Sequence, residues 1–201
     1  MNALCFGGSF NPVHNAHLQC SIIAARQAGF NRVVLIPTGQ PALKDDDYQI
    51  ASAADRVAML RLATKSVTDP QTAVEIDTLE IDRAGGPSYT IDTVRALRDR
   101  GWLSVNWLIG ADQLLSLHRW HRFEELLTSA QMWVMARPGY LIDWGNVHPA
   151  ARALEARVLQ VPQMDISATD IRRRVREGLP IIGLVPDDVR EYILKRRLYI
   201  P

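Results

Sequence analysis

Residues 3–17 read ALCFGGSFNPVHNAH, and this stretch decides the fold class. Its first four residues are apolar and run into a glycine pair, a pattern that indicates a buried parallel strand ending in a turn. Apolar residues at helical spacing then run over residues 17–28, and Gly29 stands where a helix would end. A second apolar run covers residues 32–36. Together these segments predict a strand–helix–strand unit, whose crossover is right-handed.

The alternation of strands and helices continues along the chain. We expect further strands over residues 73–81, 105–109, 132–136 and 158–161, and further helices over residues 52–65, 90–100, 122–130, 168–177 and 186–197. Residues 38–50 are polar and acidic, and we expect them to form a loop. This order predicts an α/β fold, namely a Rossmann-like, open and mostly parallel sheet with helices on both faces.

The length of 201 residues suits one domain that needs neither disulfides nor a metal to hold its core. We expect residues 1–201 to form a single domain, with an Arg-rich and helical C-terminal subdomain over about residues 166–201. The composition, 47% hydrophobic and 22% charged, excludes a disordered or collagen-like chain.

The charge and cysteine content narrow the class of protein further. The formal net charge is only +1, whereas a protein that coats nucleic acid is normally strongly basic. Two cysteines are too few for a disulfide scaffold and suit a reducing compartment. No apolar stretch approaches the roughly 18 residues of a membrane helix. We therefore expect a cytoplasmic protein without nucleic-acid or membrane partners.

The turn after the first strand is the first candidate site. In open α/β sheets, ligands bind beyond the carboxyl ends of the strands. Gly7 and Gly8 allow backbone N–H groups to approach an anion closely. His14 and His17, at the start of the next helix, can both direct ring N–H donors at that anion. The spacing matches neither a Walker loop nor a dinucleotide-binding fingerprint.

Two other interpretations of this turn remain open. One is a plain glycine turn followed by surface histidines at a helix cap. The other is a metal site made from His14, His17 and Cys20, for which the sequence offers no evident second ligand group.

Residues 166–172, which read ISATDIR, form the second candidate site. Ser167 or Thr169 fits the N-cap of a helix. Hydroxyl and N–H groups at a helix start, together with the guanidinium group of Arg172, suit a bound phosphate. The alternative is an ordinary capped helix with a solvated basic face from Arg172 to Arg176.

Together, GGSFNPVHNAH and ISATDIR resemble the two signature motifs of the nucleotidylyltransferase superfamily, His-x-Gly-His and Ile-Ser-x-Thr-x-x-Arg. Further segments resemble the bacterial nicotinate-nucleotide adenylyltransferases, and this likeness spans essentially the whole chain. These segments are residues 37–44, 87–93 (PSYTIDT), 110–112 (GAD), Trp120, 137–140 (RPGY) and 186–199. The resemblance implies transfer of AMP from ATP to nicotinate mononucleotide, which forms deamido-NAD and pyrophosphate, with Mg²⁺ as the cofactor.

The resemblance also implies roles for individual residues. It assigns catalysis to His14, His17, Lys44 and Arg172. It assigns ATP binding to Gly7, Gly8, Ser9, Phe10, Gly110, Asp112, Ser167 and Thr169. It assigns nicotinate mononucleotide binding to Tyr89, Thr90, Trp120 and Arg137. Mg²⁺ would arrive with ATP, and no metal site of the protein's own is expected. Without the resemblance, Trp120 would be a packing aromatic and Thr90 a helix N-cap.

Three positions depart from the family's pattern. Asn11 stands where the family usually has Asp, and Ala16 replaces the usual Gly between the histidines. Leu43 stands where His is common, which bears on one phosphate or substrate contact. None of these departures removes a histidine, the lysine or the arginine.

Three alternative functions stay open. The first is the same chemistry on another acceptor, such as nicotinamide mononucleotide or phosphopantetheine. The second is a nucleotide-binding regulator without turnover, against which the intact set His14, His17, Lys44 and Arg172 argues. The third is an α/β scaffold for a protein partner. We also expect loop 38–50 to close over the ligands, and the sequence leaves a homo-oligomer open.

Overall fold

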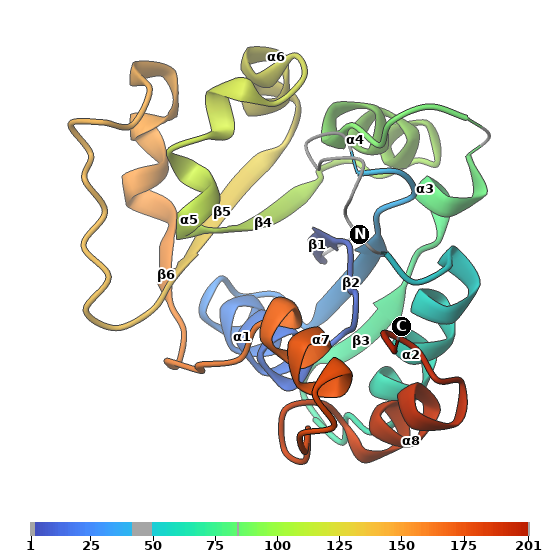
Figure 1. Ribbon diagram of the computed structural model, residues 1–201. Coiled ribbons are helices and arrows are strands. Elements are labelled where there is room, and N and C mark those ends of the chain that lie inside the picture. The colour runs from blue at the N-terminus through green and yellow to red at the C-terminus, as the bar shows by residue number, and fades with distance from the viewer. Residues whose placement is uncertain (1–2, 42–49, 84, 201) are drawn as a thin grey trace.

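A computed structural model describes residues 3–41, 50–83 and 85–200 of the protein. Its sheet contains six strands: β1 (Leu4–Gly8), β2 (Arg32–Pro37), β3 (Ala73–Ile76), β4 (Asn106–Gly110), β5 (Gln131–Ala136) and β6 (Val158–Gln160). All neighbouring strands are parallel, and their order across the sheet is β3-β2-β1-β4-β5-β6 (Figure 1). The winding direction switches at β1 and β4, the place where open α/β sheets bind their ligands. The predicted Rossmann-like fold is confirmed.

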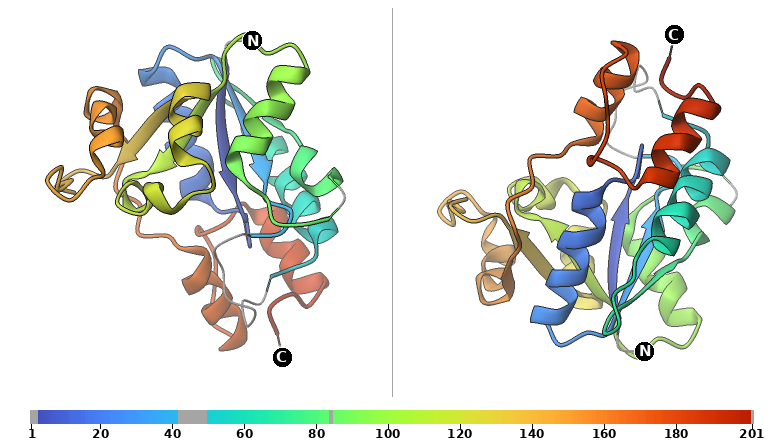
Figure 2. Two further views of the ribbon diagram at one scale, coloured as in Figure 1. Left: turned by 90° about the horizontal axis from the view of Figure 1, so that it is seen from above. Right: turned by 90° about the horizontal axis from the view of Figure 1, so that it is seen from below.

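Helices cover both faces of the sheet, as the sequence predicts. They are α1 (Asn15–Gln27), α2 (Ala53–Lys65), α3 (Leu79–Asp82), α4 (Thr90–Asp99), α5 (Ala111–Leu114), α6 (Phe123–Ser129), α7 (Ala168–Arg176) and α8 (Asp187–Lys195), with 3-10 helices η1 (Leu117–Arg119) and η2 (Pro149–Arg157). Figure 2 shows α4 and α6 on one side of the sheet, and α1 and α2 on the other. Within the described residues, no helix has the length and apolar character needed to cross a membrane.

The sheet separates two apolar clusters. Alternate residues of β1 point to opposite faces, so that Leu4 and Phe6 join the cluster under α1 and α2, whereas Cys5 joins the cluster under α4 and α6. Residues 33–36 of β2 alternate in the same way. Burial on both faces explains why these strands are continuously apolar in the sequence.

The predicted strand over residues 73–81 is wrong in its second half. β3 ends at Ile76, and α3 begins at Leu79. The carboxylate of Asp77 accepts a hydrogen bond from the backbone N–H of Leu79 at 3.0 Å. Aspartate side chains commonly bond to the backbone two residues on, and this bond turns the chain before the strand can continue.

Four short helices were not predicted from the sequence: α3, α5, η1 and η2. The first three span four residues or fewer, which is too short for a helical apolar period to be visible. The fourth, η2, begins at Pro149, and the imidazole of His148 accepts a hydrogen bond from the backbone N–H of Ala150 at 3.3 Å. Its start is therefore fixed by a local cap and not by periodicity.

The C-terminal helices α7 and α8 pack on the α1 and α2 face. Their buried apolar side chains belong to the same cluster as those of α1 and α2: Ile171, Val175, Val189 and Ile193. The hydroxyl of Tyr192 in α8 donates a hydrogen bond to Asp55 of α2 at 2.9 Å. These contacts carry α7 to the carboxyl end of the sheet, where the second sequence motif lies (Figure 1).

One buried arginine joins the loops that follow β1 and β2. Arg56 of α2 is 2% exposed. Its guanidinium group donates to the carbonyl oxygens of Ser9 at 2.9 Å, Thr38 at 2.7 Å, Gly39 at 3.3 Å and Ala51 at 3.3 Å. The planar fork of donors suits arginine and no other residue, because several acceptors must be reached from one point. Arg56 therefore fixes the backbone around the glycine-rich turn.

We expect Arg56→Met to lower the free energy of unfolding by roughly 3 kcal/mol, because buried carbonyl oxygens lose a charged donor. Arg61 lies on the exposed side of the same helix, so Arg61→Met is the matched control and should change stability by less than about 0.5 kcal/mol. Urea denaturation of both variants measures the difference. Similar losses in the two variants would contradict the role given to Arg56.

Candidate active site

A cavity of about 790 Å³ opens at the carboxyl end of the sheet. It is bordered by the end of β1, by the starts of α1, α4, α5 and α7, and by the segment between β6 and α7. Helices that follow parallel strands place their N-termini at this end, where backbone N–H groups lack partners within the helix. The convergence of several such ends favours an anionic ligand.

Most of the residues that the sequence analysis singled out line this cavity. They are Gly7, Gly8, Ser9, His14, His17, Tyr89, Thr90, Gly110, Asp112, Trp120, Arg137 and Ser167. Phe10, Thr169 and Arg172 do not line it. Lys44 and Leu43 lie outside the described residues, as does most of the predicted loop 38–50.

The two histidines of the first motif form one rigid unit at the start of α1. His14 is the N-cap residue, and its Nδ1 accepts a hydrogen bond from the backbone N–H of His17 at 3.4 Å. In return, Nδ1 of His17 accepts from the backbone N–H of His14 at 3.3 Å. The rings lie stacked, with centroids 3.5 Å apart and planes 18° from parallel. His14 is therefore a helix cap, as one interpretation held, but it is only 5% exposed and faces the cavity instead of bulk solvent.

These contacts fix the charge and the tautomer of both imidazoles. Burial, with a smaller contribution from the nearby Arg137, lowers the pKa of His14 to about 4. Burial also lowers the pKa of His17 well below its usual value, with a contribution from His14. Both rings are thus neutral near pH 7. Because each Nδ1 accepts a hydrogen bond, the ring proton of each lies on Nε2, which is left to donate to a ligand.

Phe10 supports this pair from behind. Its ring is 1% exposed and makes an edge contact with His17, with centroids 5.1 Å apart. Phe6 also packs against Phe10 and His17. The prediction that Phe10 binds ATP is not matched by its side chain, which holds the His17 ring in place.

Gly7 and Gly110 stand at the ends of β1 and β4, where a side chain would clash with neighbouring groups. A Cβ atom on Gly7 would lie 2.6 Å from Cζ2 of Trp107, and a Cβ atom on Gly110 would lie 2.3 Å from Oδ1 of Asp112. No side chain fits at either position without displacing these groups, since real Cβ atoms keep about 3 Å or more from such atoms. Glycine at these two positions therefore leaves room for the Trp107 indole and the Asp112 carboxylate.

The second motif reaches the cavity only with its first residues. Ser167 is the N-cap of α7, and its hydroxyl accepts a hydrogen bond from the backbone N–H of Asp170 at 3.1 Å. One turn later, Arg172 is 7% exposed and donates to the carbonyl oxygen of Asn11 at 2.7 Å and to the hydroxyl of Thr169 at 3.2 Å. Arg172 thus ties α7 to the turn after β1 from behind the cavity wall.

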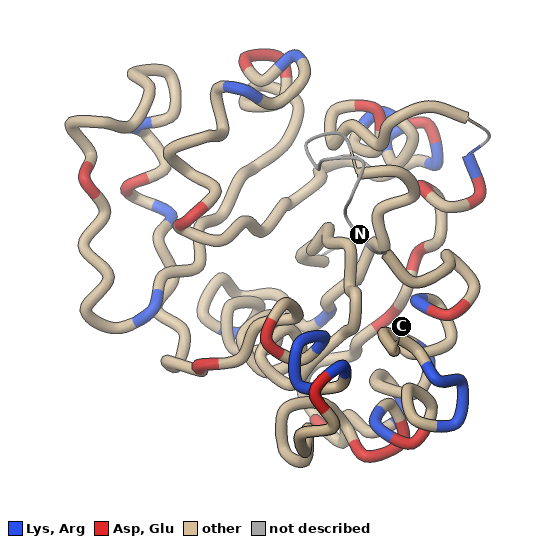
Figure 3. The backbone as a smooth tube through the Cα atoms, viewed as in Figure 1, with Lys and Arg blue, Asp and Glu red and all other residues tan. Residues whose placement is uncertain are grey.

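The remaining arginines of α7 do not make a basic face. Arg173 pairs with Asp170 and Glu177, and Arg174 pairs with Asp170. Figure 3 shows the same interleaving of basic and acidic residues along the C-terminal helices. The interpretation of the second motif as a capped helix is therefore correct for its fold, but the predicted basic face is largely neutralised.

Asn11 explains one departure from the family's pattern. It is fully buried, and its side-chain oxygen accepts from the backbone N–H of Ala51 at 3.0 Å and from the hydroxyl of Tyr199 at 2.9 Å. Its own carbonyl accepts from Arg172. A neutral amide oxygen can accept both of these bonds without leaving a buried charge, so Asn suits this position.

The far half of the cavity is aromatic. Trp120 is partly buried and lines it, and Tyr89 lines it with its ring stacked on His121 at a centroid distance of 4.3 Å. Thr90 is the first residue of α4, and the N-cap is Tyr89, which makes no side-chain cap bond. The interpretation of Thr90 as an N-cap is therefore wrong.

Sequence reasoning missed some of the lining residues. Trp107 was given no role. His121 directly follows Trp120, which suggests a place in the pocket, and it does line the cavity. Glu80 was also missed because it lies in the segment mistaken for a strand. It is 6% exposed, accepts from the Thr93 hydroxyl at 2.6 Å, and has a pKa raised by burial. Its carboxylate braces the start of α4.

A metal site from His14, His17 and Cys20 finds no support in this geometry. The imidazole Nδ1 atoms are engaged with the backbone, and the Cys20 thiol donates to the carbonyl of Pro162 at 3.9 Å. Across the described ranges, no group of three or more His, Cys, Asp and Glu side chains is arranged to hold a metal ion.

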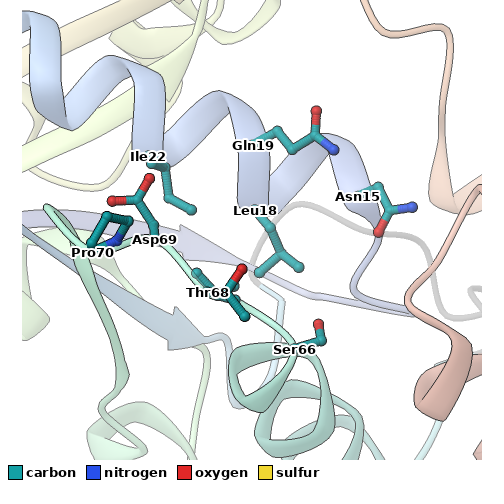
Figure 4. Close-up of a pocket in the computed structure, with 9 residues that line it drawn as sticks. Asn15, Leu18, Gln19, Ile22, Ser66, Thr68, Asp69 and Pro70 are labelled. Atoms are coloured by element: carbon teal, nitrogen blue, oxygen red, sulfur yellow. The ribbon is translucent and has the colours of Figure 1, made fainter.

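A second, smaller cavity of about 390 Å³ lies between α1 and the segment that links α2 to β3 (Figure 4). Asn15, Leu18 and Ile22 line it from the helix, and Thr68 and Asp69 line it from the segment. None of the predicted site residues contributes to it. Of these two cavities, only the larger one is lined by residues that the sequence singles out.

Comparison with known proteins gives the same assignment along nearly the whole chain. The sequence profile of the cytidylyltransferase-like family matches residues 5–174. A relative from Herpetosiphon aurantiacus, named "Probable nicotinate-nucleotide adenylyltransferase", is 38% identical over 197 residues, which is 96% of each chain. A relative of the same name from Acidothermus cellulolyticus is 40% identical over 199 residues, which is 96% of this chain and 91% of its own.

The fold is also similar to a solved structure. Plasmodium falciparum nicotinic acid mononucleotide adenylyltransferase, complexed with NaAD, superposes with a TM-score of 0.77 over 99% of this chain and 98% of its own, at 15% sequence identity. That likeness concerns the fold, whereas the two bacterial relatives match at the level of sequence along nearly their full lengths. On this ground, the chain belongs to the nicotinate-nucleotide adenylyltransferase family of the cytidylyltransferase-like superfamily.

Proposed function

We propose that this chain transfers AMP from ATP to nicotinate mononucleotide, with release of pyrophosphate, in the cavity at the carboxyl end of the sheet. The observation that carries the proposal is the stacked pair of neutral imidazoles, His14 and His17, where the glycine-rich end of β1 opens into that cavity. The near-full-length relatives named for this activity support the reaction and the choice of acceptor.

The chemistry requires positioning more than proton transfer. An oxygen of the mononucleotide's phosphate attacks the α-phosphorus of ATP, a new P–O bond forms, and the bond to the leaving pyrophosphate breaks. That phosphate has a second pKa near ~6 and is mostly dianionic at neutral pH, so no protein base has to remove a proton. Fixed donors that meet the charge developing on the phosphates then supply the rate enhancement.

The hydrogen-bond donors at the strand ends indicate where ATP would bind. Backbone groups of Gly7, Gly8 and Ser9 and the Nε2–H donors of the two histidines would meet the α-phosphate and the leaving group. The start of α7 at Ser167 would take the outer phosphates, and Gly110 and Asp112 would lie beside the adenosine. Phe10 would act through the His17 ring that it supports.

Two cationic residues complete this proposal. Lys44 would bridge phosphates as a mobile point charge. Arg172 with Thr169 would stabilise the outer phosphates from behind the cavity wall. Direct contact with a phosphate would require the bond between Arg172 and the Asn11 carbonyl to break.

The mononucleotide side uses the start of α4 and the aromatic half of the cavity. Backbone N–H groups at the first turn of α4, where Tyr89 and Thr90 line the cavity, would bind the nicotinate carboxylate. The ring of Trp120 would stack on the pyridine ring. Arg137 lines the cavity directly after β5, near His14, and would add a positive charge for a phosphate.

Magnesium fits this site as a partner of ATP. His14 and His17 present N–H donors, which suit phosphate oxygens, and the hydroxyl oxygen of Ser167 already accepts a hydrogen bond from Asp170. Mg²⁺ keeps several waters and often needs few protein ligands beside substrate phosphates, so the chain would hold it through the phosphates that these residues bind. When bound, it neutralises charge on those phosphates.

We expect His17→Ala to lower kcat by ~10²–10³, because one preorganised donor to the phosphates is lost. Circular dichroism should show a retained fold. His118→Ala is the control, since His118 is exposed and does not line the cavity. Pyrophosphate release measured with ATP, Mg²⁺ and nicotinate mononucleotide gives both rates. Near-wild-type turnover of His17→Ala would remove this residue from the mechanism.

The neutral state of the pair predicts a pH dependence of stability. The pKa of His14 is depressed to about 4 in the folded protein, so the unfolded chain binds more protons between pH 6.5 and pH 4. Stability from this group is complete above pH 6.5 and falls as the pH falls towards 4. Between pH 7.5 and pH 5 we expect a loss of about 2 kcal/mol through His14.

His14→Asn isolates this effect, because asparagine caps a helix well and does not titrate. Urea denaturation at pH 7.5 and pH 5 should show a smaller loss of stability in the variant than in the wild-type protein. Equal losses would mean that His14 is already protonated near neutral pH, contrary to the role proposed for it.

Trp120→Ala should raise the KM for nicotinate mononucleotide by roughly tenfold, since a stacked aromatic ring and its buried area are lost. The KM for ATP should not change. Trp120→Phe should keep most of the affinity because a ring remains. Initial rates over both substrates measure these constants, and an equal rise in both KM values for Trp120→Ala would place the side chain elsewhere.

A further inference from the structure

Trp107 lines the cavity from β4, one of the two central strands of the sheet. It is in β4, beside β1, where the winding of the sheet switches direction. Its indole is 2% exposed and lines the cavity. The edge of its six-membered ring lies against Gly7, where even a methyl group would collide with Cζ2 at 2.6 Å. The indole therefore occupies the space that a side chain at position 7 would fill.

Among the described residues, the indole N–H of Trp107 has no hydrogen-bond acceptor, and its nitrogen, unlike Nε1 of Trp133, is not fully enclosed by protein. A buried indole N–H normally finds a hydrogen-bond partner, because leaving such a donor unpaired is costly. Here the side chain faces the cavity, so a ligand oxygen can supply the missing acceptor. Water would satisfy the donor only until that ligand displaces it.

Trp107 belongs to the apolar cluster on the α4 side of the sheet, where the mononucleotide is proposed to bind. Trp107 packs in the apolar cluster under α4, together with Ile91 in the first turn of that helix. Tyr89, Trp120 and His121 line the same half. The stacked histidines and Ser167 instead lie with α1 and α7, whose apolar side chains belong to the cluster on the other face of the sheet.

We propose that the indole N–H of Trp107 donates a hydrogen bond to an oxygen of the bound mononucleotide, which makes Trp107 a binding residue for the acceptor substrate distinct from the stacking Trp120. This inference rests on the proposed function and deepens it. The acceptor is an anionic oxygen, which the mononucleotide carries on its phosphate and on its carboxylate.

A second indole in the protein provides an internal control. Nε1 of Trp133 is buried and also has no hydrogen-bond partner among the described residues. Trp133 does not line the cavity, and its ring packs against Phe30 at a centroid distance of 5.8 Å. Neither indole N–H has an acceptor among the described residues, but only Trp107 lines the cavity where a ligand would bind.

The direct test is the ¹H–¹⁵N spectrum of the five indole groups, with Trp107→Phe and Trp133→Phe used for assignment. Nicotinate mononucleotide is added to the wild-type protein in the presence of a non-reactive α,β-methylene analogue of ATP. We expect the Trp107 indole proton to move downfield and to exchange more slowly with solvent, while the Trp133 signal stays unchanged.

The outcomes separate this inference from the proposed function. A saturable shift of the Trp120 signal with no change at Trp107 would overturn the inference and leave the proposed function standing. Absence of a saturable change at every indole would overturn both.

Two related compounds identify the oxygen that accepts the bond. Nicotinamide mononucleotide lacks the carboxylate and nicotinate riboside lacks the phosphate. If the Trp107 signal responds to nicotinamide mononucleotide alone, the bond is to the phosphate. If it responds to nicotinate riboside alone, the bond is to the carboxylate.

Kinetics provide the second readout. Trp107→Phe keeps an aromatic ring against Gly7 and removes the N–H, so it should raise the KM for nicotinate mononucleotide by roughly tenfold and leave the KM for ATP unchanged. Trp133→Phe should change neither constant. An unchanged KM for the mononucleotide in Trp107→Phe would contradict the proposal.

Discussion

The reciprocal hydrogen bonds between His14 and His17 are the constraint on which the site depends. Each ring accepts from the backbone N–H of the other residue, so the start of α1 cannot form without fixing both rings. The same bonds place the ring protons on Nε2, and burial holds both imidazoles neutral. A helix cap and the proposed pair of phosphate donors are therefore one structure, so the local stability of α1 would set the catalytic geometry.

The turn that carries these histidines is held from several distant parts of the chain. Arg56 of α2 binds its start at Ser9, and Arg172 of α7 binds the carbonyl of Asn11. Tyr199, near the C-terminus, donates to the side chain of Asn11. The C-terminal helices thus take part in shaping the turn after β1, although they contribute little of the cavity surface themselves. Such support suits a reaction that depends on the placement of phosphate groups.

The main architecture could be predicted from the sequence because strands buried on both faces read as continuous apolar runs, and because Gly29 and similar residues mark helix ends. The second half of the 73–81 strand could not, since the Asp77 side chain ends β3 through a bond that apolar alternation does not reveal. The histidine turn was identifiable from its motif. Trp107 and Glu80 were not, because their places at the cavity follow from the packing of elements distant in sequence.

Pyrophosphate release with ATP and Mg²⁺, measured in parallel with nicotinate mononucleotide and nicotinamide mononucleotide, tests the central claim most directly. A cavity that combines phosphate donors at α1 with an uncapped start of α4 for a carboxylate should turn over the acid rapidly and the amide slowly. Release that is faster with the amide, or absent with both, would contradict the assignment of this cavity to adenylyl transfer onto nicotinate mononucleotide.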